Sequence, residues 1–350
     1  MNIDNYTADL ILSISKDNVE KIFYGDENTL KKTYKKLSLI WHPDKLKDKN
    51  HYNIKVFPHI NELYQIALNK YKTGKLSLER NCLNIKDSKN NEFIFRYKIQ
   101  KDFELGKYYI SEHYVLWQFN QEYKEDALRG LVNLTNITFY DDNMKFSFSK
   151  YVPEIKKKII SEDSLFILMN KPKGFLNLGD VLKFQNKIEP KHVAWILSTL
   201  YNNICFIHFN KIMHGGISVD NYFINPETHE GMLIGGWWYS TLIGEKLNIL
   251  PQKAIDVAPV SLLNKKEADF LLDLEMIKSL GRELLGDHTG IYLNKDKTIP
   301  KELIKWLRDG SKDSAVMEYS TWSKKILPES FGERRFSVMN IKSTDIYREV

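Results

Sequence analysis

Residues 17–72 contain two stretches of apolar side chains at helical spacing, and a proline lies between them. In the first stretch an apolar residue recurs every three or four positions, which places the set on one helix face: Leu30, Tyr34, Leu37 and Trp41. Pro43 interrupts this pattern, because proline lacks a backbone N–H and restricts the residue before it. The second stretch has the same period: Ile60, Leu63, Tyr64, Ala67, Leu68 and Tyr71. Two such helices with a short connection hide their stripes by packing as an antiparallel pair.

Local signals place the ends of these two helices. Asp26 precedes the first stripe, where its carboxylate can accept a backbone N–H as an N-cap. Pro58 precedes the second stripe, and proline is tolerated in the first turn of a helix. We therefore expect the second helix to begin at Pro58.

Four lysines lie on the face of the first helix opposite its stripe: Lys31, Lys32, Lys35 and Lys36. His42-Pro43-Asp44 follows this helix, and residues 57–64 read Phe-Pro-His-Ile-Asn-Glu-Leu-Tyr. A basic helix, this tripeptide and a following Phe-x-x-Ile-Asn-Glu-x-Tyr helix resemble the J-domain family over about residues 5–72. The resemblance implies that the loop and the basic face bind an acidic surface of a DnaK-type chaperone ATPase and accelerate ATP hydrolysis.

A plainer interpretation of this region is also available. The lysines alone are explained by a solvated helix face, and the tripeptide alone by a turn. The combination of all three parts in order favours the J-domain interpretation.

The remaining chain predicts an α+β order in which a small sheet precedes a larger helical half. Strands are expected at 93–97, 107–110, 114–119, 146–148 and 165–169, and helices at 121–134 and 191–208. Lys156-Lys157-Lys158 is expected to be a solvated turn. The predicted class is a multidomain chain: an all-α J-domain (a helical hairpin), then a two-lobed α+β domain. The predicted boundaries are a J-domain at 1–74, a linker at 75–91, a sheet-bearing lobe at 92–185, a helical lobe at 186–330 and a tail at 331–350.

A second resemblance covers about residues 92–330. Residues 212–224 read Ile-Met-His-Gly-Gly-Ile-Ser-Val-Asp-Asn-Tyr-Phe-Ile and follow a long apolar helix, as the catalytic loop of protein kinases does. Gly235-Gly236-Trp237 lies where that family has Asp-Phe-Gly, and Ala258-Pro259-Val260 resembles Ala-Pro-Glu. Asp273 matches the anchoring carboxylate of the helix that follows. The resemblance implies that this part of the chain has a two-lobed protein-kinase-like fold.

The chemistry of phosphoryl transfer is missing at most of the aligned positions. The catalytic Asp is replaced by Gly216, the loop Lys by Ser218, and the metal-binding Asp by Gly235. The strand lysine is aligned with Gln118, and Gly106 stands without a glycine-rich loop. Asn221 is retained. Glycine cannot replace a carboxylate, so the resemblance implies a pseudokinase that is not an enzyme.

Two further features of this half have competing interpretations. His214 and Asn221 are expected to brace the loop backbone in preference to binding a nucleotide. Trp237, Trp238 and Tyr239 are expected to be core or interface in preference to a ligand platform.

Composition limits the remaining possibilities. A net charge of +6 is small for a nucleic-acid-binding protein, so a nucleic-acid partner is not expected. Cys82 and Cys205 are far apart, which predicts neither a disulfide framework nor a zinc site, and no cofactor or metal is expected. No signal peptide and no membrane span are recognisable, so a cytoplasmic protein with no membrane partner is expected.

Three hypotheses follow from these patterns. The first is a co-chaperone whose J-domain activates a DnaK-type ATPase and whose pseudokinase binds an unknown client protein; its combination of parts suggests a phage or other viral origin. The second is an atypical kinase-like phosphotransferase with displaced catalytic residues. The third is a non-enzymatic adaptor.

Overall fold

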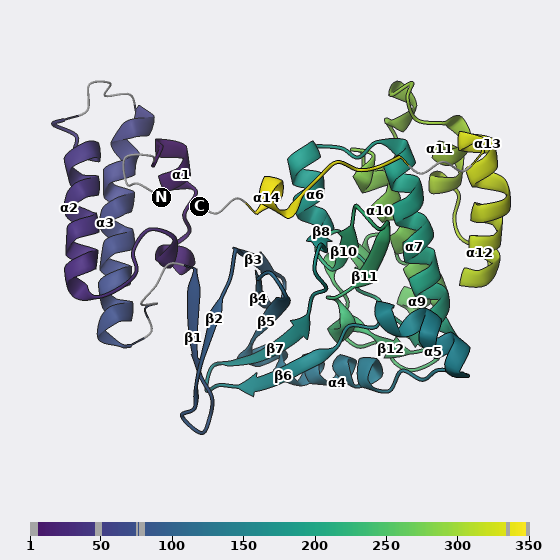
Figure 1. The fold of residues 1–350 in the computed structure, drawn as a ribbon, viewed down its shortest axis with the longest axis horizontal. Coiled ribbons are helices and arrows are strands. Elements are labelled where there is room, and N and C mark those ends of the chain that lie inside the picture. The colour runs from purple at the N-terminus through teal and green to yellow at the C-terminus, as the bar shows by residue number, and fades with distance from the viewer. Residues whose placement is uncertain (1–5, 46–50, 75, 77–80, 334–336, 348–350) are drawn as a thin grey trace. The chain divides into compact units, whose positions relative to one another are not determined.

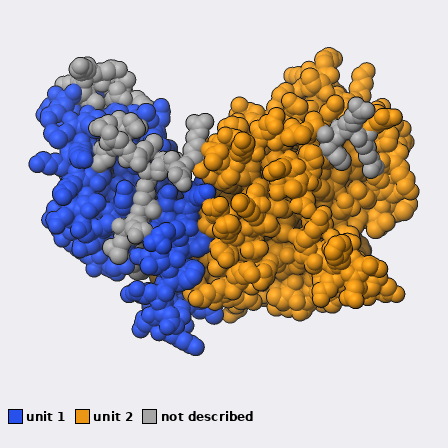
Figure 2. All heavy atoms as spheres, in the orientation of Figure 1, with its two compact units in different colours: residues 1–100, 160–162, 349–350 blue, residues 101–159, 163–348 orange. Residues whose placement is uncertain are grey.

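The computed structural model describes residues 6–45, 51–74, 76, 81–333 and 337–347. The chain divides into two compact units, which Figure 2 shows in different colours. Unit 1 comprises residues 1–100, 160–162 and 349–350, and unit 2 comprises residues 101–159 and 163–348. Helices dominate the N-terminal part of unit 1, whereas unit 2 mixes helices and strands (Figure 1). The expected multidomain α+β class is confirmed at this level.

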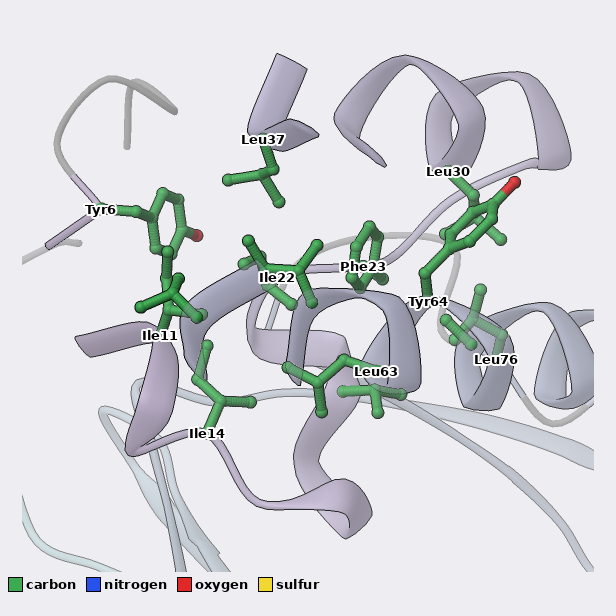
Figure 3. Close-up of a cluster of buried hydrophobic side chains, with 14 residues drawn as sticks. Tyr6, Ile11, Ile14, Ile22, Phe23, Leu30, Leu37, Leu63, Tyr64 and Leu76 are labelled. Carbon is green, nitrogen blue, oxygen red and sulfur yellow. The ribbon is translucent and has the colours of Figure 1, made fainter. Parts of the chain in front are cut away.

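Unit 1 is built on an antiparallel pair of helices that pack along their apolar stripes (Figure 1). Its helical elements are α1 (Ala8–Leu12), a 3₁₀ segment (Lys16–Lys21), α2 (Glu27–Trp41) and α3 (His51–Lys72). Their apolar side chains form one core, in which Leu30, Leu37 and Leu63 are fully buried (Figure 3). The predicted helical hairpin is therefore confirmed.

The start of α2 was predicted correctly, and the start of α3 was not. The Asp26 carboxylate caps α2 by accepting the Thr29 N–H at 2.7 Å. α3 begins at His51, and Pro58 lies inside it with an exposed ring. The helix continues through Pro58 because the loss is one backbone hydrogen bond, whereas the flanking Val56 and Ile60 are fully buried.

A β-hairpin occupies much of the segment expected to be a linker. β1 (Cys82–Lys86) pairs antiparallel with β2 (Glu92–Arg96), and the Asp87 carboxylate fixes the turn by accepting the Asn91 N–H at 2.8 Å. Both strands belong to unit 1, so the boundary between the compact units falls at residue 100. The segment expected to be a linker at 75–91 therefore contains a strand, and the domain start expected at 92 lies within a hairpin of unit 1. The alternation of apolar Leu83 and Ile85 with polar Asn84 and Lys86 is typical of such a strand.

The sheet of unit 2 has five strands in the order β3-β4-β5-β7-β6. Its strands are β3 (Ile99–Phe103), β4 (Gly106–Ile110), β5 (Tyr114–Asn120), β6 (Ile155–Ile160) and β7 (Ser164–Asn170). α4 (Lys124–Thr135) follows β5 and was predicted from its apolar period. Central β5 and β7 pair antiparallel over their full length and are mostly buried.

Two sequence predictions in this half are wrong. The expected strand at 146–148 is the end of helix α5 (Asp142–Phe148), which Asp141 caps and which packs Phe148 on Phe206 with ring centroids 5.0 Å apart. The expected turn at 156–158 is part of β6. β6 lies at the edge of the sheet, where exposed lysines prevent further strand pairing.

The rest of unit 2 is mainly helical and surrounds the long buried helix α7. Its helices are α6 (Leu178–Gln185), α7 (Pro190–Phe209), α8 (Gln252–Ile255), α9 (Val260–Lys265), α10 (Phe270–Leu284), α11 (Lys301–Arg308), α12 (Ala315–Thr321), α13 (Leu327–Phe331) and α14 (Ser343–Ile346). Its short strands are β8 (Leu176–Asn177), β9 (Ile212–Met213), β10 (Tyr222–Asn225), β11 (Glu230–Leu233) and β12 (Thr241–Leu242). α7 agrees with the predicted helix at 191–208. In the described part of the chain, no helix combines the length and apolarity that a membrane span needs.

Candidate functional site

The tripeptide His42-Pro43-Asp44 forms the turn after α2 in unit 1 and is accessible. His42 caps the end of α2, where its N–H donates to the Ser38 carbonyl at 3.0 Å. The His42 and Asp44 side chains are 43% and 85% exposed, so both polar groups can reach a partner. Pro43 fixes the backbone between them.

Contacts within unit 1 hold the His42 imidazole in place. The Asp44 N–H donates to His42 Nδ1 at 3.3 Å, and the Asp44 carboxylate lies 3.5 Å from the same nitrogen. The edge of the imidazole also meets Phe57 of α3, with ring centroids 5.0 Å apart. A partner would therefore meet an imidazole whose orientation is largely set before binding.

The four predicted lysines of α2 are all exposed, as a steering surface requires: Lys31, Lys32, Lys35 and Lys36. Lys31 forms an ion pair with Glu27 one turn earlier, at 2.6 Å. The hydrogen bond to Glu27 raises the pKa of Lys31. Its charge is partly compensated, so we expect the other three lysines to contribute more to attraction of an acidic surface.

A polar contact inside the helix pair fixes α2 against α3. The Tyr34 hydroxyl donates to Asn61 Oδ1 at 2.6 Å, and the Tyr34 ring stacks on Tyr64 with centroids 4.2 Å apart. Asn61 and Tyr64 belong to the pattern that suggested the second helix. These contacts set the rotation of the lysine face relative to the loop.

In unit 2, Asp273 of α10 organises the loop at 213–221. Its buried carboxylate accepts the backbone N–H groups of His214 and Gly215, each at 2.8 Å. His208 of α7 lies 2.9 Å from the same carboxylate through Nε2. The carboxylate is thus satisfied by three donors, as a buried charge requires. Asp273 does anchor this loop.

His214 and Asn221 contact the loop backbone, as the bracing interpretation expects. His214 Nδ1 accepts the Gly216 N–H at 3.2 Å, and Asn221 Nδ2 donates to the Gly216 carbonyl at 2.8 Å. Burial lowers the pKa of His214 to about 4, although Asp273 opposes this shift. A neutral His214 therefore supports the loop at physiological pH.

The glycines at the two aligned carboxylate positions are closely surrounded. A Cβ at Gly216 would come within 2.7 Å of the Gly236 carbonyl oxygen. A Cβ at Gly235 would come within 2.5 Å of Asn221 Oδ1 and of the Trp117 ring. Neither position has room for an aspartate side chain. The third aligned position, Ser218, is half-buried beside them.

Gln118 does not face this loop, which corrects the alignment of the strand lysine. Its amide bonds to the Tyr109 hydroxyl at 2.8 Å and to the Ser164 hydroxyl at 3.2 Å. Successive side chains of a strand point to opposite faces, so it is the neighbouring Trp117 that points toward Gly235. A periodicity of two cannot distinguish these faces without a known register.

An aromatic cluster fills the space between the sheet and this loop. Phe103 of β3 packs on Trp117 and on Trp238, with centroids 5.4 Å apart in both pairs. Trp117 and Trp238 are 4.5 Å apart and fully buried. The residues Trp237, Trp238 and Tyr239 are all buried, so they belong to the core in preference to a ligand platform.

A polar cluster that the sequence analysis missed lies beside the aromatic one. Lys101 Nζ is 2.7 Å from Asp180, 2.9 Å from Asn177 Oδ1 and 3.5 Å from Asp220. Tyr108 donates its hydroxyl to Asp220 at 3.0 Å. Burial raises the pKa of Asp180, and the Lys101 charge opposes that shift. No local sequence pattern marks these residues, because they come from separate elements.

A small cavity of about 140 Å³ remains at the mouth of this region. Its lining combines apolar side chains, such as Ile217 and Met276, with five polar or acidic residues: Asp102, Glu104, Ser218, Asp220 and Asn221. No group of three or more potential metal ligands is present among the described residues. The cavity therefore offers acidic groups without a metal site.

No model of a known protein family matches this sequence, and no curated protein is significantly similar to it. The two regions are interpreted from their own chemistry. Unit 1 presents an accessible His-Pro-Asp loop beside a basic helix. Unit 2 contains a loop at 213–221 that Asp273 anchors, together with two closely surrounded glycines, Gly216 and Gly235.

Proposed function

We propose that this protein is a J-domain co-chaperone that stimulates the ATPase of a DnaK-type heat-shock chaperone. One observation carries the proposal: an accessible His42-Pro43-Asp44 loop joins two packed antiparallel helices, the first of which carries an exposed lysine face. A loop alone or a basic face alone would be unspecific. Their combination on one small helical scaffold is what the resemblance requires.

The chemistry of the loop suits transient recognition of an acidic protein surface. Lys32, Lys35 and Lys36 can accelerate encounter electrostatically. The oriented imidazole of His42 and the exposed carboxylate of Asp44 can then form directional hydrogen bonds. The affinity of such a contact depends on salt at the lysines and on hydrogen-bond geometry at the loop.

For unit 2 we propose a kinase-like fold without catalysis that binds the client or another partner. Support comes from the element order, a small sheet with one helix before a helical half, and from the Asp273 anchor of the loop at 213–221. Gly216 and Gly235 supply no carboxylate and leave no room for one. The reaction therefore lacks both its base and a metal ligand.

A displaced-residue phosphotransferase is the second candidate, and one observation favours it. Lys101 and Asp220 lie 3.5 Å apart next to Asn221, so a lysine, an aspartate and an asparagine do meet in the cleft. However, Lys101 is already compensated by Asp180 and Asp220 and has little charge left for phosphate. We therefore favour the non-enzymatic assignment.

The test is the steady-state ATPase rate of a purified DnaK-type chaperone with the full-length protein added. We expect clear stimulation by the wild type and a loss of roughly tenfold or more with His42→Gln. His113→Gln is the matched control, because His113 is an exposed histidine of unit 2. Absence of stimulation by the folded wild-type protein would refute the co-chaperone proposal.

A pull-down with the same variants separates the two units' partners. We expect His42→Gln to lose the chaperone ATPase while retaining whatever binds unit 2. Incorporation of phosphate from Mg-ATP into any substrate would instead support the phosphotransferase.

A further inference from the structure

The space between the sheet of unit 2 and its helical half, called the cleft below, is occupied by residues from two places in the sequence. They are the end of β3 with the following Glu104, and Tyr347, which follows α14 (Figure 1 shows both elements). We propose that these segments occupy the cleft in place of a ligand, so that unit 2 stays closed and excludes nucleotides. This inference uses the kinase-like part of the proposed function, and it does not depend on the J-domain activity.

Phe103 is the apolar residue that fills the cleft. Its ring makes edge contacts with Trp117 and with Phe119 at centroid distances of 5.4 and 5.6 Å. It also lies 5.4 Å from Trp238, which follows the Gly235-Gly236 turn. The rings pack on one another here, so a planar ligand has no space among them.

Lys101 is the cationic occupant. It connects the sheet to three polar residues of the helical half: Asn177, Asp180 and Asp220. Asp180 is only 7% exposed, so removal of the lysine would leave a buried carboxylate without its cation. The Lys101–Asp180 ion pair therefore opposes separation of the sheet from the helical half of unit 2.

Glu104 makes a second connection across the cleft. Its carboxylate accepts the Gln252 N–H at 3.0 Å and the Tyr239 hydroxyl at 3.5 Å. Phe103, the last residue of β3, is thus held on both sides along the chain, by Lys101 two residues before it and by Glu104 directly after it.

The C-terminal segment covers the same polar cluster. The Tyr347 hydroxyl accepts the Asn177 N–H at 3.0 Å, and Tyr347 is 5% exposed. Burial raises the pKa of Tyr347, and the nearby Asp180 carboxylate acts in the same direction, so the phenol remains protonated. Tyr347 therefore shields the Lys101–Asp180 pair from water.

Charge disfavours a nucleotide in the space that remains. The lining of the cavity of about 140 Å³ includes Asp102, Glu104 and Asp220, the last of which is paired with Lys101. Its lysine, Lys253, pairs with Glu283 at 2.9 Å. A triphosphate would meet carboxylates with no metal site among the described residues to screen them. The filled space and the acidic lining thus both disfavour binding of a nucleotide.

The experiment combines thermal unfolding with hydrogen exchange on the full-length protein. We expect the melting temperature to stay within about 1 °C when millimolar Mg-ATP or Mg-ADP is added, because a ligand must bind the folded state to stabilise it. We also expect slow amide exchange across residues 101–106 without any ligand. A rise of roughly 5 °C or more with either nucleotide, or fast exchange in this turn, would overturn the proposal.

Two variants test the internal occupants. Lys101→Ala and Phe103→Ala should each speed exchange at residues 101–106 by roughly tenfold or more, whereas Lys183→Ala, an exposed lysine of α6, should not. Unchanged exchange in both cleft variants would contradict the proposal. If one variant fails to fold, the other and the wild-type measurements still decide. Stimulation of the chaperone ATPase is measured in parallel, so a failure of the J-domain proposal is seen separately.

Discussion

The indole ring of Trp117 lies against Gly235, where any side chain larger than hydrogen would collide with it. The closest approach of an added Cβ to the ring would be 2.5 Å. Gly235 also donates its N–H to the Asn221 carbonyl at 3.1 Å, so the backbone cannot easily retreat. The packing of the Trp117 ring therefore requires glycine at position 235.

Gly235→Ala should destabilise unit 2 by about 1–3 kcal/mol, because the methyl group overfills a packed site. Gly310→Ala is the matched control, since an added Cβ there would lie 3.9 Å from the closest neighbouring atom. Urea unfolding followed by tryptophan fluorescence reports on unit 2, because six of the seven tryptophans belong to it. Equal midpoints for the two variants would contradict the packing described here.

Reversing the charge at Lys32 and Lys35 together should weaken chaperone binding by roughly tenfold at low salt. The effect should shrink as ionic strength rises, because the attraction is screened over about 10 Å at 0.1 M salt. Association rates measured by surface plasmon resonance at two salt concentrations test this. Lys183→Glu, on unit 2, is the control that should leave the rate unchanged. A loss independent of salt would argue against electrostatic steering.

Pro58→Ala should stabilise α3 by about 1–3 kcal/mol, since alanine restores a backbone hydrogen bond and is the best helix former. Pro58 is exposed, so no packing is lost. The expected readout is amide exchange in α3 that is slower by roughly tenfold. Lys55→Ala, another exposed position of the same helix, should change it little. Faster exchange after Pro58→Ala would mean that the proline is favourable where it stands.

Unit 2 should lose stability as the pH falls from about 6.5 to 4, through His214. Its pKa is lowered from 6.5 to about 4 in the folded protein, so the unfolded chain binds more protons in this range. The contribution of His214 to the free energy of unfolding is complete above pH 6.5 and amounts to about 3 kcal/mol. Asp180 acts in the opposite sense, because its raised pKa favours the folded state at low pH.

Urea unfolding at pH 7 and pH 5 measures this dependence. His214→Asn should flatten it, whereas the exposed control His113→Asn should retain it. If the free energy of unfolding of His214→Asn still fell between pH 7 and pH 5, the pH dependence would belong to other groups.

The helical part of unit 1 was predictable because its signals are local. The stripe of α2, the cap at Asp26 and the break at Pro43 all act within a few residues. Pro58 misled the prediction of where α3 starts. Proline is usually confined to the first turn because a proline inside a helix costs about 3 kcal/mol. Burial of the apolar face of α3 stabilises the helix by more than this cost, so α3 continues through Pro58.

Three strands of the unit 2 sheet, β4, β5 and β7, were predicted from the sequence, whereas β3, β6 and the faces of the strands were not. Phe, Tyr and Val marked β4 and β5, yet the choice between Trp117 and Gln118 depended on which face of β5 meets the helical half. Lys156-Lys157-Lys158 carries no apolar alternation, so no local pattern marks it as a strand. Its place at the edge of a sheet is decided by the neighbouring strand β7.

The amino-acid sequence by itself determined the helix pair, the His42-Pro43-Asp44 turn beside a lysine-rich helix, and the glycines at positions 216 and 235. Only the tertiary structure decided that Lys101, Asp180 and Tyr347 meet, and that aromatic rings fill the cleft. The physical reason is range. Helix periodicity and capping depend on residues within one or two turns of each other. A polar cluster depends on how elements that are distant in the sequence pack together, so no local sequence pattern predicts it.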